Sequence, residues 1–322
     1  MTSEVKTEIT MTCPDCQTQC QRFGKHRNGL RRFRCSQCRK TYTEPHTRTL
    51  GEMYISEEKA ILALQLLLEG NSIRSTERIT KVDRNTIMKL LVRAGEKCEK
   101  IMGRLIVNVP VENVQCDEIW GFVQKKEAHK TPEEANNQSI GDAYCYVAME
   151  RKTKLVLNFA LGRRNQATTD IFIEGLRAAT SSQRFQITTD GFQPYVSAIT
   201  TTLEDRADYA QQIKVYASSR DDHRYSPGTV VDMEKVPVMG NPDTRRTSTS
   251  HIERQNLTIR MSVRRLTRLT NAFSKKWENL WAAYCLHFAY YNFCRIHSSI
   301  RVTPAMEAKI ADHVWDLSEL LA

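Results

Sequence analysis

The amino-acid sequence predicts a multidomain α/β protein in which two small modules precede one large domain. Two Cys-x-x-Cys pairs lie in a short polar N-terminal segment, amphipathic helical patterns follow it, and strand-like and helix-like segments then alternate to the end. The chain has 322 residues, which is enough for one large domain or two to three small ones. We therefore expect modules at about 10–48 and 54–105 and a large domain at about 110–322.

Composition and charge limit the classes of protein to which the chain can belong. Lys and Arg number 47 against 37 Asp and Glu, so the formal net charge is +10, and the mean hydropathy is −0.50. The longest nearly apolar stretch, Ala60–Leu68, is much shorter than the roughly 20 residues that span a bilayer. The N-terminus has neither the basic nor the apolar region of a signal peptide. We expect a cytoplasmic protein that is neither membrane-bound nor secreted.

The two Cys-x-x-Cys pairs have the spacing of a zinc site. The other cysteines are scattered without a disulfide framework, and a chain without an export signal stays in a reducing compartment. Four thiolates in two such pairs can surround one Zn²⁺ tetrahedrally. Gly24, Asn28 and Gly29 suit a hairpin turn, and residues 30–34 can return as a strand. The pattern predicts a zinc ribbon that needs its metal to fold, rather than four unpaired surface thiols. The expected ligands are Cys13, Cys16, Cys35 and Cys38.

Three short helices are predicted between residues 54 and 105. Ser56 is a suitable N-cap for the first, the turn Gly70–Ser72 separates it from the second, and Asp83 can cap the third. Helices joined in this way resemble a helix-turn-helix, whose recognition helix enters the major groove of DNA with its N-terminal residues. The alternative is a three-helix packing unit without DNA contact. The side chains placed for base contact are Arg84, Asn85, Thr86 and Lys89.

Basic residues are concentrated in two runs. Residues 22–40 carry no acid, and residues 245–276 carry a single acid, Glu253. Such clusters favour a polyanionic partner, most simply nucleic acid, whereas a solvated surface would intersperse Asp and Glu. Three arginines of the second run recur every four residues, which predicts one helix face for phosphate contacts. They are Arg260, Arg264 and Arg268.

The large domain alternates strand and helix patterns. Strands are predicted at 114–123, 143–150, 155–161, 184–189 and 213–216. Helices are predicted at 168–178, at 195–203 and from about Thr249 onward, and the last of these is long and basic. A polar loop is expected at 219–248. Aromatic residues at helical spacing after residue 276 predict a C-terminal helical extension that is part of the core.

The order β-β-β-α-β-α-β-α is that of an RNase H-like fold. In that topology the first and fourth strands are neighbours, so Asp117 on the first and Asp190 after the fourth would lie side by side. Strand alternation puts Glu118 on the face opposite Asp117. The late helix would bring Glu253 over the two aspartates. Clustered carboxylates repel one another unless they hold cations, and oxygen ligands favour Mg²⁺ or Mn²⁺. Two such ions can promote in-line attack on a phosphodiester.

Several segments resemble transposases of the insertion-sequence-one (IS one) type. They are CPDC…CSQC, the CDEIW strand, the TTDGF turn, TSTSHIERQNLTIRMSVRRLTRLTNAFSKKWENL and YYNFCRIHSSIRVTPAMEA, and together they extend from about Cys13 to Leu321. The resemblance implies a DDE transposase with an RNase H-like catalytic core. Its zinc ribbon and helix-turn-helix would recognise the terminal inverted repeats of an insertion sequence. Its core would cleave double-stranded DNA and join it to target DNA with Mg²⁺ (or Mn²⁺).

The resemblance also implies roles for individual residues. Asp117, Asp190 and Glu253 would be the catalytic, metal-binding triad. Arg260 would contact DNA near the scissile phosphate, and Arg254 and Asn256 would contact DNA or the metal ligands. Pairing two DNA ends implies a homodimer or a higher assembly in the synaptic complex. The expected location is the prokaryotic cytoplasm, in association with the nucleoid.

The third acid and the function both have alternatives. The separation of Asp190 from Glu253 is longer than in many DDE enzymes, because of an insertion at about 193–248. The acids of this insertion that compete as third ligand are Asp221, Asp222, Asp232 and Glu234. One rival function is a DNA-binding regulator with an inactive core, against which the complete acidic set argues. The other is an RNase H-type nuclease acting on RNA–DNA hybrids, which would leave the N-terminal modules unexplained.

Overall fold

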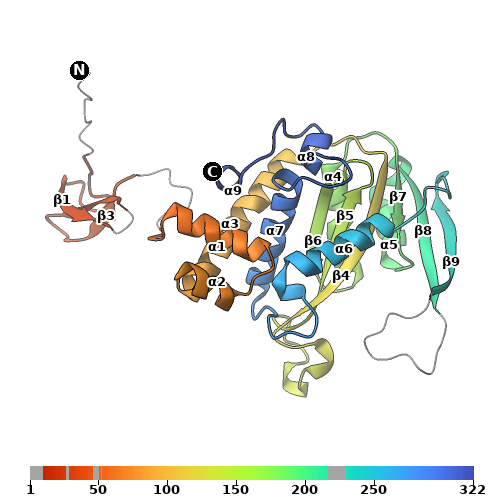
Figure 1. The fold of residues 1–322 in the computed structure, drawn as a ribbon, viewed down its shortest axis with the longest axis horizontal. Helices are drawn as coiled ribbons and strands as arrows, with labels where there is room; N and C mark the ends of the chain where they lie inside the picture. The colour runs from red at the N-terminus through yellow and green to blue at the C-terminus, as the bar shows by residue number, and fades with distance from the viewer. Residues whose placement is uncertain (1–9, 27–28, 46–50, 52, 217–229) are drawn as a thin grey trace.

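The computed structural model describes residues 10–26, 29–45, 51, 53–216 and 230–322, and Figure 1 shows its elements. This part of the chain contains one sheet of three strands and one of six, together with helices. The multidomain α/β class predicted from the sequence therefore agrees with the structure. None of the described helices combines the length and apolar character needed to cross a membrane.

The N-terminal module contains a small antiparallel sheet. Its strands β1 (Cys20–Lys25), β2 (Arg31–Cys35) and β3 (Thr41–Thr43) pair in that order. Phe33 is buried, and its buried apolar neighbours in this module are all cysteines: Cys13, Cys20 and Cys35. So small a cluster buries too little apolar surface to stabilise a module by itself. A bound metal would supply the missing stabilisation.

Three helices follow, at the predicted places. They are α1 (Glu57–Leu68), α2 (Ile73–Thr80) and α3 (Arg84–Leu105). The side chain of Ser72 caps α2, and Asp83 accepts hydrogen bonds from the first amides of α3. The third helix is not short, because its second half packs along α7 (Trp277–Phe293). Gly95 permits this contact, since a Cβ there would lie 2.5 Å from the Cα of Ala282.

The large sheet has the strand order β6-β5-β4-β7-β8-β9. Its strands are β4 (Asn113–Val123), β5 (Gly141–Glu150), β6 (Val156–Gly162), β7 (Phe185–Thr189), β8 (Ala207–Tyr216) and β9 (Val230–Met239). The β4–β7 and β7–β8 pairs are parallel, and the other pairs are antiparallel. The prediction that the first and fourth strands of this domain are neighbours is confirmed by the β4–β7 pair.

Helices pack on this sheet. α4 (Gln166–Ala179) contacts β6 and α5 (Pro194–Thr202), while α6 (Ser250–Ser262) lies along β4 (Figure 1). The C-terminal extension comprises α7, α8 (Pro304–Glu307) and α9 (Leu317–Leu321). Short 3-10 helices lie at Glu127–His129, Pro132–Glu134, Glu204–Arg206 and Arg264–Leu266. The aromatic residues of α7 are largely buried, as predicted, and α1–α3 share one hydrophobic cluster with the large sheet.

Three predictions for the second half of the chain were wrong. The segment expected to be a polar loop contains β9, which pairs with β8 as an edge strand, and β8 begins at Ala207 rather than at 213. β9 is mostly exposed on both faces. Its sequence therefore lacks the pattern of a buried face from which a strand is predicted. The basic helix ends at Ser262, so Arg260, Arg264 and Arg268 do not share a helix face.

The early end of α6 has a local cause. Arg260 donates hydrogen bonds of 3.1 Å to the backbone carbonyls of Leu266 and Trp120, and the Thr267 hydroxyl donates to the carbonyl of Arg260. These bonds turn the chain back onto the end of its own helix. Four-residue spacing of arginines in the sequence does not reveal such a contact, because it depends on residues of a distant strand.

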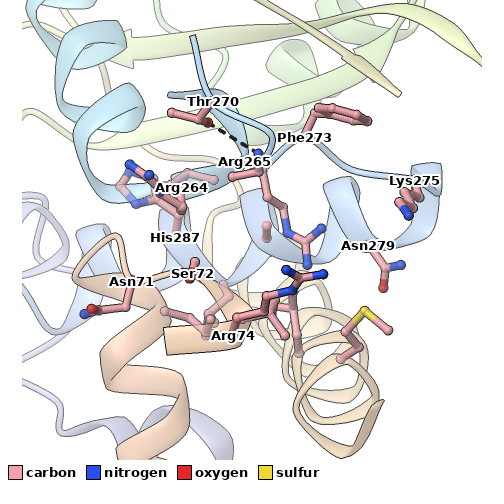
Figure 2. A pocket seen from close by; sticks show the side chains of 18 of the residues that line it. Asn71, Ser72, Arg74, Arg264, Arg265, Thr270, Phe273, Lys275, Asn279 and His287 are labelled. Carbon is pink, nitrogen blue, oxygen red and sulfur yellow. Dashed lines mark hydrogen bonds between the residues drawn. The ribbon is translucent and has the colours of Figure 1, made fainter. Parts of the chain in front are cut away.

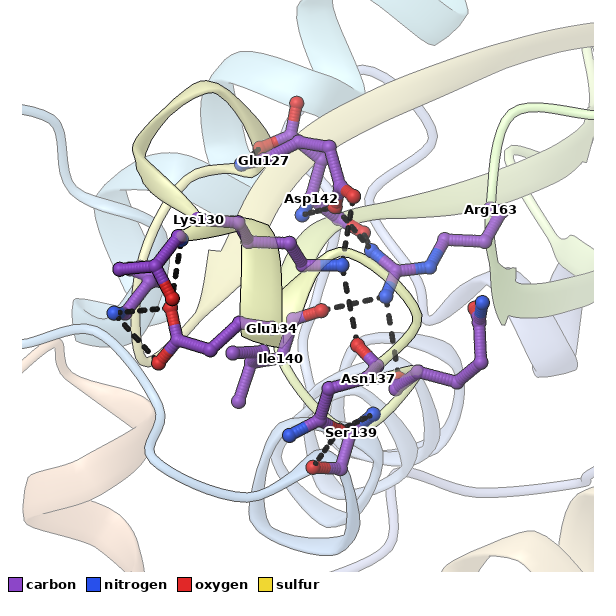
Figure 3. Close-up of polar contacts among 11 residues, drawn as sticks. Glu127, Lys130, Glu134, Asn137, Ser139, Ile140, Asp142 and Arg163 are labelled. Atoms are coloured by element: carbon purple, nitrogen blue, oxygen red, sulfur yellow. Dashed lines mark hydrogen bonds and ion pairs between the residues drawn. The ribbon is translucent and has the colours of Figure 1, made fainter.

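The segment between β4 and β5 is held by charged side chains (Figure 3). Glu127 forms ion pairs with Lys130 at 2.7 Å and with Arg163 at 3.2 Å. Arg163 also donates to the carbonyls of Gln138 and Ile140, at 3.2 and 2.6 Å. These contacts hold the segment against the C-terminal end of β4.

Candidate catalytic cleft and metal centres

Three carboxylates cluster at the point where β4 and β7 stop pairing. Asp117, Glu118 and Asp190 each offer an oxygen within 4.8 Å of the others. β4 pairs with β7 only as far as Gln115 with Thr188, and β7 ends at Thr189. Asp190 therefore lies in the turn beyond the paired strands. There its carboxylate lies near those of both Asp117 and Glu118, although these two residues lie on opposite faces of β4, as strand alternation predicts.

The cluster is electrostatically costly without a cation. Burial raises the pKa of Asp117 to about 7, and the neighbouring charge of Glu118 adds to this effect. Burial also raises the pKa of Glu118, with a further contribution from Asp190. Carboxylates that repel one another in a partly dehydrated cleft are suited to a divalent cation, and their oxygens are the ligands that Mg²⁺ and Mn²⁺ favour.

Glu253 lines the same cleft but is outside the three-acid cluster. The cleft has a volume of about 560 Å³, and Asp117, Asp190 and Glu253 all contribute to its wall. Glu253 forms an ion pair with Lys214 of β8 at 2.5 Å, and the hydroxyl of Thr249 donates to the same carboxylate oxygen. The third predicted acid thus shares the cleft with the two aspartates, and a lysine neutralises it there.

Two buried glutamines fix the start of α6, and with it the position of Glu253. Oε1 of Gln115 on β4 accepts hydrogen bonds of 3.0 Å from the backbone amides of His251 and Ile252. Oε1 of Gln212 on β8 accepts from the amide of Thr249 at 2.9 Å. The first amides of a helix have no partner within it. Side chains from two strands of the sheet supply these partners.

Arg164 occupies the other side of the cleft. Its Nε donates to Glu118 at 3.0 Å, and its NH2 lies 3.6 Å from Asp190. The guanidinium also lies 3.8 Å from the centre of the Phe192 ring. Arg164, Lys214, Gln115 and Gln212 are not predicted from the sequence, because each lies far along the chain from the acid or helix that it contacts.

The acids of the insertion do not line this cleft where the structure describes them. Asp232 and Glu234 are exposed on β9. Asp221 and Asp222 lie outside the described residues. Among the acids that the structure describes, Glu253 is therefore the one from the second half of the chain that lines the cleft with Asp117 and Asp190.

The basic residues predicted for DNA contact lie in different surroundings. Arg254 is exposed on α6, and Asn256 on the same helix donates to Asp117 at 2.8 Å. Both NH groups of Arg260 are occupied by the backbone carbonyls described above, and burial lowers its pKa. Arg264 lines a cavity near α2, and Arg268 is exposed in a turn.

The residues predicted for base contact lie in the first turns of α3. Arg84, Asn85 and Lys89 are exposed and Thr86 is half-buried, while Ile87 and Leu90 face the core. The helix therefore presents the predicted side chains on its outer surface. This exposure is required for insertion into a DNA groove.

The four predicted zinc ligands lie together at one end of the small sheet. Their sulfur atoms are all within 4.8 Å of one another, and Sγ of Cys13 is 3.7 Å from Sγ of Cys38. Four Zn–S bonds of about 2.3 Å at tetrahedral angles place the sulfurs about 3.8 Å apart. A hydrogen bond from Thr18 lowers the pKa of Cys35 to about 6, which favours the thiolate that binds metal. The cluster fits one Zn²⁺.

Comparisons with known proteins find similar sequences and similar structures, among them the following two. No family model matches the chain. Over 84 residues the chain is 30% identical to the insertion element iso-IS1N protein InsA of Shigella dysenteriae, a match that covers 26% of this chain and 89% of that protein. A cryo-EM structure of the piggyBac transposase synaptic complex with hairpin DNA matches 86% of this chain and 71% of its own, with a TM-score of 0.40 and 11% identity. At this similarity the match to piggyBac implies no shared function.

Proposed function

We propose that this chain, which belongs to the family of the insertion-element protein InsA, is a DDE transposase of the IS one type. In this proposal it binds the terminal inverted repeats of an insertion sequence, cleaves the DNA at their ends and joins the ends to target DNA. The observation that supports it most strongly is the single cleft that Asp117, Asp190 and Glu253 all line. A protein that only binds DNA gains nothing from buried, mutually repelling carboxylates.

In this proposal the residues of the cleft have three different roles: they bind metal, position its ligands and balance charge. Asp117, Asp190 and Glu253 would hold Mg²⁺ or Mn²⁺, and Asn256 keeps the Asp117 carboxylate oriented through its hydrogen bond. The bound cations supply activation of the attacking oxygen and stabilisation of the leaving oxygen. Gln115 and Gln212 keep Glu253 over the aspartates by holding the start of α6. Arg164 and Lys214 balance the carboxylate charge in the metal-free cleft.

DNA recognition is assigned to the N-terminal modules. The exposed first turns of α3 would read bases through Arg84, Asn85, Thr86 and Lys89. On the small sheet, Phe23 is exposed and the guanidinium groups of Arg32 and Arg34 each lie 5.1 Å from its ring centre. An exposed aromatic ring with two cations near it suits contact with a phosphate backbone and its bases. Pairing two element ends would require at least a dimer.

A strand-transfer assay tests this function. The purified protein with Zn²⁺ bound is mixed with Mg²⁺, a labelled duplex carrying the native element end, and supercoiled target plasmid. We expect joined product from the wild type and from the control Asp232→Asn, which changes an exposed acid on β9. Asp117→Asn should give none, because it removes a metal-binding charge.

The same assay separates the rival functions. Tight binding to the element end without cleavage or joining would favour the DNA-binding regulator. Cleavage of RNA–DNA hybrids without strand transfer would favour the RNase H-type nuclease. Either result, obtained with Mg²⁺ and Mn²⁺, would overturn the transposase assignment.

A further inference from the structure

A second cavity lies between the helical module and the large domain, away from the acids. It has a volume of about 880 Å³ and is lined by the end of α1, the starts of α2 and α3, residues 262–276, and α7 (Figure 2). Its two walls are held close together, because Gly70 in the α1–α2 turn lies against the end of α6. A Cβ on Gly70 would be 2.7 Å from the carbonyl oxygen of Met261.

The lining of this cavity carries positive charge alone. No acidic side chain is among its described lining residues, and none of its basic residues forms an ion pair with any described residue. Surface arginines and lysines are ordinarily interspersed with acids. The basic lining residues are Arg74, Arg84, Arg264, Arg265, Lys275 and Lys276.

Arg265 provides an unsatisfied donor at this site. Its NH1 donates to the hydroxyl of Ser274 at 3.0 Å, whereas its NH2 is buried and has no hydrogen-bond partner within the described chain. A buried guanidinium N–H without an acceptor is costly, and guanidinium groups bind phosphate oxygens in two-pronged geometry. Figure 2 shows Arg74 of α2 pointing toward Arg265 from the opposite wall. An anion between two such cations would relieve their repulsion and accept their hydrogen bonds.

We infer that this cavity binds a phosphate group of the DNA backbone, held between Arg74 and Arg265. The choice of DNA as the source of the phosphate rests on the proposed function. α6 runs from Glu253 in the catalytic cleft to Ser262 at this cavity, which is about 14 Å along the helix axis at 1.5 Å per residue. A phosphate bound here would anchor DNA at the joint between the recognition helices and the catalytic domain.

Equilibrium DNA binding at several salt concentrations tests the inference. The probes are a fluorescent duplex carrying the element end and a duplex of the same length with random sequence. Arg265→Met removes the buried guanidinium at similar volume, and Arg74→Ala removes the exposed one. The control is Arg177→Ala, an exposed arginine on α4 away from the cavity.

We expect Arg74→Ala and Arg265→Met each to weaken binding of both duplexes about tenfold and to reduce the slope of log K against log salt concentration by about one. Arg177→Ala should bind as the wild type does. Wild-type affinity and slope in both cavity variants, or an equal loss in the control, would overturn the inference. If circular dichroism shows that Arg265→Met does not fold, the binding of Arg74→Ala alone tests the phosphate site.

Failure of the proposed function gives a different result. A protein that shows no strand transfer and yet loses affinity in the two cavity variants has the phosphate site without the transposase activity. Intact strand transfer together with unchanged DNA binding in both variants refutes the phosphate site alone.

Discussion

The side-chain amide of Asn256 donates a hydrogen bond of 2.8 Å to the carboxylate of Asp117, which lies on β4, one of the two middle strands of the sheet. This bond links α6 to β4 at the acids themselves. Asn256 lies about one turn after Glu253 on α6. The same helix therefore supplies both Glu253 and the amide that orients Asp117.

Removal of this amide should weaken metal binding. We expect Asn256→Ala to lower the affinity of the protein for Mn²⁺ by about ten- to hundredfold, because the Asp117 carboxylate loses its oriented partner. Titration followed by electron paramagnetic resonance measures the affinity directly. Thr258→Ala, on the same helix, serves as the control. A loss of thermal stability without a change in Mn²⁺ affinity would assign Asn256 a purely structural role.

Gln115 should contribute to stability through the start of α6. Gln115→Leu leaves the amides of His251 and Ile252 without their acceptor, and we expect the free energy of unfolding to fall by roughly 2–4 kcal/mol. Urea denaturation measures this change. The exposed Gln183, changed to Leu, is the matched control and should have little effect. Equal stability of both variants would show that α6 is held by other contacts.

The crossing of α3 and α7 should tolerate no side chain at Gly95. Gly95→Ala forces the two helices apart, since its Cβ would lie 2.5 Å from the Cα of Ala282, and we expect a loss of about 1–3 kcal/mol. Gly103 lies on the same helix with no atom near its would-be Cβ. Gly103→Ala should instead add about 0.5–1 kcal/mol through helix propensity. A stabilising effect of both substitutions would contradict the close helix contact.

Metal content should depend on the four clustered cysteines and not on their neighbour. The wild type should contain one zinc ion in the N-terminal module, and Cys35→Ser should lose it, together with protease resistance of residues 10–45. Cys20 is buried beside the cluster but outside the four-sulfur group. Cys20→Ser should therefore keep the metal. Elemental analysis of both variants measures this, and retention of zinc by Cys35→Ser would refute the site.

The sequence predicted the features that depend on local pattern and chain order. The β4–β7 pairing follows from element order, and it brings Asp117 and Asp190 together. Glu118 lies on the face opposite Asp117, as alternation predicts, because Asp117 contacts Asn256 of α6 whereas Glu118 contacts Arg164. Asp190 still approaches both carboxylates, because it lies in the turn beyond the end of β7. β9 was missed because an exposed edge strand has no buried face to produce a pattern. The end of α6 was missed because contacts of Arg260 with distant backbone determine it.

The two basic side chains of the cleft, Arg164 and Lys214, could not be predicted from the sequence for a related reason. Arg164 follows β6, and Lys214 lies on β8, so each reaches its carboxylate only through the packing of the whole sheet. Nothing in the local sequence of either residue distinguishes it from other surface cations.

The central claim is that Asp117 and Asp190 hold a divalent cation. Anomalous diffraction from crystals grown with Mn²⁺ tests it most directly, because manganese is located independently of any activity. The account predicts a manganese peak bonded to the carboxylates of Asp117 and Asp190, and no peak there in crystals of Asp190→Asn. An ordered cleft without manganese at saturating Mn²⁺, or a peak that persists in Asp190→Asn, would contradict it.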